Sequence, residues 1–76
     1  MKSALITLKL AENVKDFVNI VNKYDMEVDL RSGRFVIDAK SILGIFSLDL
    51  SKPITLEIHS DKADALLAEL KPFFSK

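Results

Sequence analysis

The chain has 76 residues, no cysteine, and equal numbers of basic and acidic side chains, 11 of each, so its formal net charge is zero. This length allows a single small domain, and the charge balance gives no global attraction to nucleic acid or to an acidic membrane. Because small secreted domains often depend on disulfides, a cysteine-free chain that lacks a long apolar leading segment is expected to be cytosolic. The longest apolar runs, such as residues 42–46, are too short to span a bilayer.

The first half of the chain predicts a strand, a helix and a hairpin. Apolar and polar residues alternate from Ala4 to Leu10, which indicates a strand, and Asn13 is the predicted N-cap of the helix that follows. Alternation from Met26 to Leu30 and again around Phe35, separated by a Ser-Gly turn, predicts a hairpin. The apolar face of the helix recurs at three- and four-residue spacing and comprises Val14, Phe17, Val18, Val21 and Tyr24.

The second half predicts a short helix, a last strand and a final helix. The short helix begins at Lys40-Ser41, with Ile45 and Leu48 facing inward. Pro53 opens the last strand, in which Ile54, Leu56 and Ile58 face inward. Ser60 or Asp61 is predicted to cap the final helix, which Pro72 should end near Lys71. The apolar face of that helix comprises Ala63, Leu66, Leu67, Leu70 and Phe74.

The predicted element order is β-α-β-β-α-β-α over one domain, residues 1–76. Each strand has one apolar and one mostly polar face, so the helices are expected to cover a single side of the sheet. The fold class is therefore α/β, more narrowly an α+β open-faced sandwich in which three helices cover one face of a four-stranded antiparallel sheet. The predicted exposed face carries Thr7, Lys9, Glu27, Asp29, Thr55, Glu57 and His59. The predicted core includes Phe17, Val21, Leu56, Ile58, Leu66 and Leu70.

One segment resembles a known family. Residues 39–48 read Ala-Lys-Ser-Ile-Leu-Gly-Ile-Phe-Ser-Leu, with a basic residue, a serine, two apolar residues and further apolar positions at Ile45 and Leu48. This pattern is similar to the regulatory-serine segment of HPr phosphocarrier proteins of the sugar phosphotransferase system, and the element order on both sides is also similar to HPr. The resemblance covers nearly the whole chain and implies an HPr-like open-faced sandwich with three helices on one face.

The segment before the first helix departs from that family. HPr proteins place a Gly-aliphatic-His-x-Arg-Pro-like motif there, whereas the corresponding region of this chain, residues 10–16, contains no His, Arg or Pro and is several residues shorter. Phosphoryl transfer needs an imidazole nucleophile at the positive end of a helix, with donors around the phosphoryl oxygens. Glu12 and Asp16 would repel a phosphoryl group, so relay from this segment is not expected.

Ser41 and its neighbours are the candidate regulatory and partner-binding residues. Ser41 is expected to cap the short helix, and by resemblance it corresponds to the serine that HPr kinase phosphorylates; both roles are compatible. If Ile45 and Leu48 face the core, then Ile42, Leu43 and Phe46 face solvent and, with Lys40, form a partner-binding surface like the one HPr uses. The alternative is a rotated helix that places some of these three residues in the core.

The rest of the sequence offers no catalytic or metal site. His59, the only histidine, is expected on the polar face of the last strand, exposed and unpaired, and no further ligands cluster near it. The basic residues are scattered and the two glycines form no phosphate-binding loop. We therefore expect no enzyme activity, no cofactor, no metal, no nucleic-acid or membrane partner, and a monomer.

Three functions remain open from the sequence. The first is an HPr-like regulatory or protein-interaction module without phosphocarrier activity. The second is an atypical phosphocarrier that either uses His59 or needs a partner to supply the missing groups. The third is a ferredoxin-like regulatory domain for a small ligand.

Overall fold

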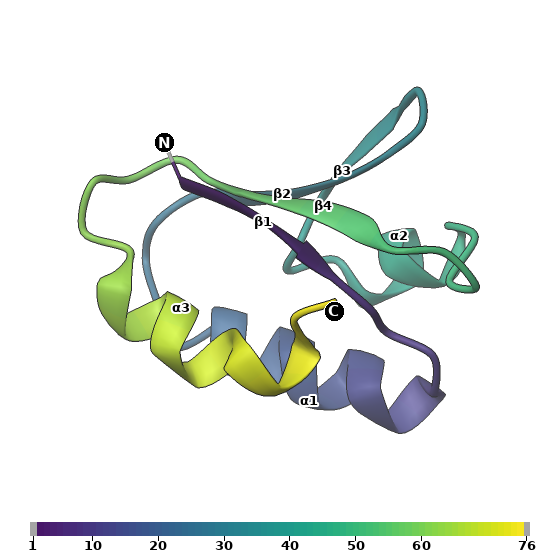
Figure 1. Cartoon of the computed structure of the whole chain (residues 1–76), viewed down its shortest axis with the longest axis horizontal. Coiled ribbons are helices and arrows are strands. Elements are labelled where there is room, and N and C mark those ends of the chain that lie inside the picture. The colour runs from purple at the N-terminus through teal and green to yellow at the C-terminus, as the bar shows by residue number, and fades with distance from the viewer. Residues whose placement is uncertain (1, 76) are drawn as a thin grey trace.

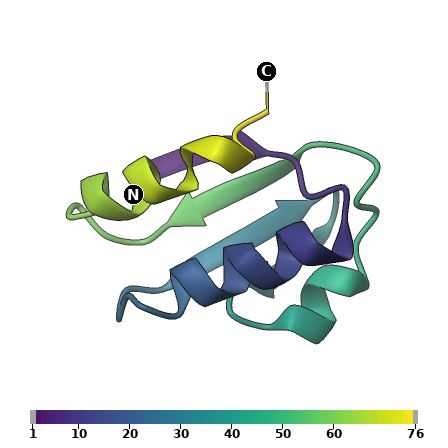
Figure 2. The same ribbon diagram turned by 90° about the horizontal axis from the view of Figure 1, so that it is seen from below.

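The structure is a computed structural model that describes residues 2–75. The predicted order of elements is confirmed: β1 (Lys2–Ile6), α1 (Ala11–Val21), β2 (Val28–Ser32), β3 (Phe35–Asp38), α2 (Ile42–Phe46), β4 (Ile54–Ile58) and α3 (Asp64–Leu70), followed by a 3₁₀ turn, Lys71–Phe73. The four strands form one antiparallel sheet in the order β1-β4-β2-β3. The helices lie together on one face of that sheet (Figures 1 and 2). The open-faced sandwich predicted from the alternation of each strand is therefore confirmed.

The core lies between the sheet and the helices. Every residue of the predicted core has no exposed surface, and Ile45 and Leu48 of the α2 segment also face inward. Burying side chains of this size contributes roughly 1.5–3 kcal/mol each, which is why the apolar faces at periods of 2 and 3.6 residues determine the layers. None of the seven residues predicted on the exposed face of the sheet is buried.

β1 is shorter than predicted, ending at Ile6 rather than Leu10. The β1–β4 ladder ends at the pair Ile6–Ile54, and the next residue of the partner strand is Pro53, which has no N–H to extend the ladder. Thr7 instead donates its N–H to Phe73 O at 2.8 Å. Leu10, predicted as the last residue of this strand, is instead the N-cap of α1 and is 62% exposed.

Both long helices begin at a residue other than the predicted cap. Leu10 is the N-cap of α1, and Asn13 lies in its first turn, where its Oδ1 accepts the Leu10 N–H at 3.1 Å. Asn13 therefore stabilises the helix start by reaching back from the third helical position, as the second residue of a capping box does. At α3 the N-cap is Ala63, while Ser60 Oγ accepts the Lys62 N–H at 3.0 Å and so closes the turn before the helix. α3 ends at Leu70, two residues before Pro72, which agrees with the predicted end near Lys71.

Candidate functional site

The start of α1 presents carboxylate and apolar groups rather than nucleophiles. Leu10, the N-cap, is exposed, and Glu12 and Asp16 are exposed in the first two turns. The free N–H groups of a helix start attract anions, but Glu12 already supplies negative charge there. Leu10 and Ala11 have no side-chain atom that could accept a phosphoryl group.

Ser41 is the N-cap of α2, as predicted. Its Oγ accepts the Gly44 N–H at 3.2 Å, and its own N–H donates to Asp38 O at 2.9 Å. The residue is exposed, so its hydroxyl is open to solvent while it caps the helix. The serine is thus held at the junction between β3 and α2 by one bond on each side.

Gly44 allows α2 to lie close to the sheet. A Cβ atom at this position would lie 3.1 Å from Ser41 Oγ and 3.3 Å from Ile37 Cδ1 of β3. Both distances are tighter than ordinary van der Waals contact, so a larger residue would push the helix from β3 or disturb the cap. The orientation of α2, and with it the direction of its outer face, depends on this close approach.

The outer face of α2 carries exposed apolar side chains. Leu43 is 82% exposed and Phe46 is 45% exposed, whereas Ile42 is half-buried and packs against the core. The predicted orientation is thus found for Leu43 and Phe46, and Ile42 forms the boundary between the outer face and the core. We call Ile42, Leu43 and Phe46 the α2 surface. The N-terminal half of α1 lies beside the α2 helix (Figure 2).

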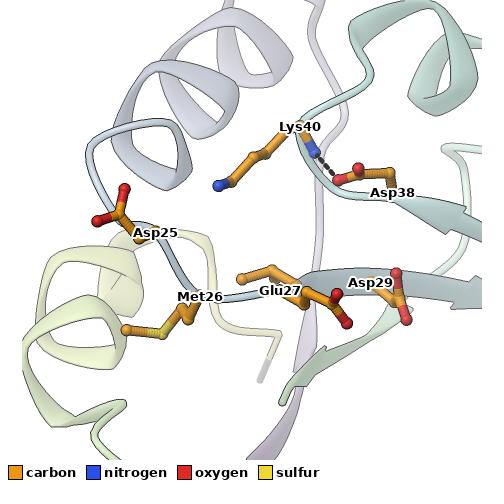
Figure 3. Close-up of a pocket in the computed structure, with 7 residues that line it drawn as sticks. Asp25, Met26, Glu27, Asp29, Asp38 and Lys40 are labelled. Carbon is orange, nitrogen blue, oxygen red and sulfur yellow. Dashed lines mark hydrogen bonds between the residues drawn. The ribbon is translucent and has the colours of Figure 1, made fainter. Parts of the chain in front are cut away.

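Lys40 points away from the α2 surface. Its Nζ donates to Tyr24 O at 2.7 Å, just beyond the end of α1, and the side chain is half-buried. It lines a pocket of about 160 Å³ whose other walls are the loop after α1, the start of β2 and the end of β3 (Figure 3). Lys40 was predicted to join the partner-binding surface, but its ammonium group binds the loop after α1 instead of lying with Leu43 and Phe46. The pocket is otherwise lined by Asp25, Met26, Glu27, Val28, Asp29 and Asp38.

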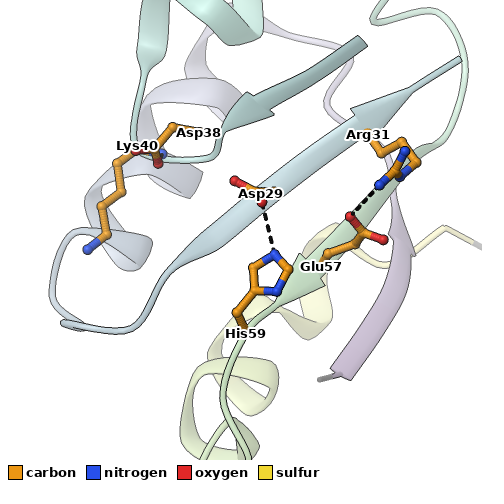
Figure 4. A network of polar contacts seen from close by, with 6 residues as sticks. All are labelled: Asp29, Arg31, Asp38, Lys40, Glu57 and His59. Atoms are coloured by element: carbon orange, nitrogen blue, oxygen red, sulfur yellow. Dashed lines mark hydrogen bonds and ion pairs between the residues drawn. The ribbon is translucent and has the colours of Figure 1, made fainter. Parts of the chain in front are cut away.

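The open face of the sheet carries two cross-strand polar pairs (Figure 4). His59 Nε2 donates to Asp29 Oδ2 at 2.9 Å, and Arg31 lies 3.3 Å from Glu57. The expectation of an unpaired histidine is therefore wrong. This pair could not be predicted from the sequence, because it joins residues 30 positions apart that only the β2–β4 register brings together. The alternating acidic residues before and within β2 are the one feature of the sequence that suggests an acidic partner for His59.

Within residues 2–75, no group of three or more His, Cys, Asp or Glu side chains has a metal-binding arrangement. No helix in this part of the chain is long and apolar enough to cross a membrane.

Comparisons with known proteins identify the family. A family model described as "PTS HPr component phosphorylation site" matches residues 10–76. This chain belongs to the HPr phosphocarrier family. An HPr protein from Thermoanaerobacter tengcongensis is 28% identical, with a TM-score of 0.74 over 92% of this chain and 90% of that one. The phosphocarrier protein HPr from Bacillus anthracis is 25% identical, with a TM-score of 0.73 over 97% of this chain and 94% of that one.

A third solved structure extends the agreement in fold. The histidine-containing phosphocarrier protein from Mycoplasma is 20% identical, and its TM-score is 0.73 over 93% of this chain and 86% of that one. The HPr fold is therefore shown, and the ferredoxin-like alternative has no support. HPr-family proteins are carriers rather than catalysts in themselves and interact with other proteins of the phosphotransferase system.

Proposed function

We propose that this HPr-family chain is a regulatory or protein-interaction module that binds partner proteins through the α2 surface and does not relay phosphoryl groups from the start of α1. The exposure of Leu43 and Phe46 on a helix whose other face is buried carries this proposal. Exposed apolar side chains that lie together on a small domain are typical of a protein contact. We expect the module to act in the cytoplasm, as a monomer at the low concentrations of a binding assay.

The start of α1 supports the absence of relay from that segment. A carrier at a helix N-terminus needs a nucleophile that the helix dipole and nearby donors can assist. Here the N-cap is an exposed leucine, and Glu12 adds a carboxylate in the first turn. An incoming phosphoryl group would meet like charge and no nucleophilic nitrogen.

His59 keeps the atypical phosphocarrier as a second candidate. Its bond to Asp29 fixes the imidazole in one orientation, which is how a nucleophilic histidine is held in many active sites. The same face also carries the carboxylate of Glu57, which is paired with Arg31. Carboxylates around an imidazole oppose a phosphoryl group, so we place this function second.

The two candidates are separated by incubation with enzyme I and labelled phosphoenolpyruvate. We expect no label on this chain under conditions in which the Bacillus anthracis HPr is labelled. Acid-labile label that disappears in a His59→Ala variant would instead establish the atypical carrier and overturn the proposal.

Binding through the α2 surface is tested with a double variant, Leu43→Ala and Phe46→Ala. Because both side chains are exposed, the fold should hold while identified partners recovered from cell extract are lost. Leu5→Ala is the matched control, since Leu5 is 53% exposed and lies on β1. Equal loss of partners in the control would show that general surface hydrophobicity, and not the α2 surface, retains them.

Ser41 is the candidate site of regulation on this surface. We propose that phosphorylation there would change which partners bind, because the added charge would lie next to Ile42 and Leu43. The exposed hydroxyl at the N-cap supports this proposal, since a kinase must reach the oxygen and the helix start accommodates negative charge.

A further inference from the structure

The two outer strands of the sheet differ in how their edges are covered. Along β1, the C-terminal segment forms a bridge between Ile6 and Phe74, and Ser75 donates its N–H to Leu5 O at 2.8 Å. β3 is the other outer strand, and within residues 2–75 no strand pairs with its outer side. An uncovered edge presents backbone donors and acceptors that another strand can pair with.

The register of the hairpin determines which backbone groups of β3 point outward. Ala39 donates its N–H to Val28 O at 2.9 Å, and residues opposite each other in an antiparallel pair alternate between bonded and non-bonded. Phe35 and Ile37 are therefore the residues of β3 that bond to β2. The N–H and C=O of Val36 point away from the sheet and are available to a second strand.

β3 exposes one large apolar side chain on each face of this edge. Phe35 is 69% exposed and Val36 is 46% exposed, and successive residues of a strand point to opposite faces. Phe35 is on the helix side with Ile37, and Val36 is on the open side. A strand added at the edge would cover both of these side chains.

The charged residues at the two ends of β3 indicate which charges a strand added at this edge should carry. Asp38 lies directly opposite Asp29, an unfavourable like-charge pair in a sheet. Asp29 has His59 as its partner (Figure 4), whereas Asp38 Oδ1 accepts the backbone N–H of Lys40 at 2.8 Å (Figure 3). Arg34, four residues before Asp38, is exposed and has no side-chain partner within residues 2–75. The edge thus carries a positive residue at one end and a negative residue at the other.

We propose that two copies of this chain pair antiparallel through β3, with Val36 opposite Val36 of the second copy. This register gives two reciprocal Val36 N–H···O=C bonds around a two-fold axis. It sets Arg34 of each copy opposite Asp38 of the other and Phe35 opposite Ile37. The pairing is self-complementary because the charges at the two ends of β3 have opposite sign.

The dimer is weak. β3 has four residues, and stable specific interfaces bury about 1,200–2,000 Å², more than two such strands provide. Pairing therefore occurs at high protein concentration, and the dilute chain is a monomer. Because the contact includes exposed ion pairs, added salt weakens it.

The test is self-association measured by sedimentation equilibrium and by amide NMR spectra from micromolar to millimolar protein. Arg34→Glu and Asp38→Arg should each weaken association by about tenfold or more, since each replaces two attractive cross-strand pairs by repulsive ones. Mixing the two variants should restore a heterodimer, because the introduced glutamate of one copy then faces the introduced arginine of the other, and the two native charges face each other as well. The double variant should restore the homodimer for the same reason. Lys62→Glu, with the same change of net charge as Arg34→Glu but placed before α3, is the matched control.

Each result decides the proposal. The proposal is supported if the amide NMR shifts that depend on protein concentration centre on residues 34–38. It also requires that each single variant loses self-association and that mixing the two variants restores it. The proposal is overturned if the wild type does not self-associate at millimolar protein, or if Arg34→Glu leaves association unchanged. It is also overturned if the single variants lose association and their mixture does not restore it. A melting temperature for each variant shows that the fold is intact, which matters for Asp38→Arg because it removes the acceptor of the Lys40 N–H.

Discussion

Replacing Ser41 separates its structural role from a regulatory one. Its Oγ is the side-chain cap of α2, at 3.2 Å from the Gly44 N. Loss of such a cap in Ser41→Ala costs about 1 kcal/mol, within a range of about 0.5–2 kcal/mol. In a domain of this size a loss of about 1 kcal/mol corresponds to a change in melting temperature of roughly 4–8 °C. Because Ser41 is exposed, no cavity adds to this loss.

The matched variants are Ser41→Asn and Ser41→Asp. Both side chains cap a helix about as well as serine, so urea and thermal unfolding should place both near the wild type. Only Asp adds a charge, so only Asp should change the set of bound partners, repelling acidic partners and recruiting basic ones. An unchanged melting temperature in Ser41→Ala would refute the capping argument. Retention of every partner by a folded Ser41→Asp variant would refute the regulatory one.

Two further predictions concern stability. Leu66 of α3 has no exposed surface, so Leu66→Ala should lower the free energy of unfolding by about 2–5 kcal/mol in urea, and an unchanged midpoint would mean that the buried face of α3 is misassigned. Lys23 and Tyr24 both donate to Glu69, which lowers the pKa of that carboxyl below its usual 4.5. Because the pKa of Glu69 is lower in the folded state than in the unfolded state, the ionised carboxyl stabilises the fold above pH 4.5. This stabilisation is lost as the pH falls through the pKa of the folded state, so the difference in melting temperature between wild type and Glu69→Gln should shrink in acid. A gap that is constant with pH would contradict this linkage.

The layers and the core could be predicted because they depend on local periodicity. Alternation in β4 and the three- and four-residue spacing in α1 determine which side chains point inward, whatever the rest of the chain does. Phe17, Leu56 and Leu66 are buried for that reason. The same holds for Ser41, because a serine directly before a short apolar helix has a local role as its cap.

The element boundaries could not be predicted because distant residues determine them. β1 ends where its partner strand begins after Pro53, and this limit appears only once the β1–β4 register is known. With the strand shortened, Leu10 becomes the cap of α1 and Asn13 moves inside the helix. Neither propensity nor spacing in residues 4–13 contains that information.

The distant partners of two side chains could not be predicted, for a related reason. Lys40 precedes Ser41 directly, which suggested a charge beside the serine, but its flexible stem reaches the carbonyl of Tyr24, 16 residues away along the chain. His59 likewise meets Asp29 only through the register of β2 and β4. For these residues the sequence indicates the charge, and the topology determines where it acts.

Asp38 links the two proposed surfaces. Its carbonyl accepts the Ser41 N–H at 2.9 Å, and the residue lies opposite Asp29 at the end of the uncovered strand β3. A negative charge at Ser41 would therefore strengthen the attraction of this end of β3 for Arg34 of a second copy. We predict that Ser41→Asp self-associates a few-fold more tightly than Ser41→Asn at low salt, a size typical of exposed charge pairs. The difference should disappear at high salt and in an Arg34→Glu background. Tighter association of both Ser41 variants, or a difference that persists with Arg34→Glu, would show that the charge at Ser41 does not act through the β3 edge.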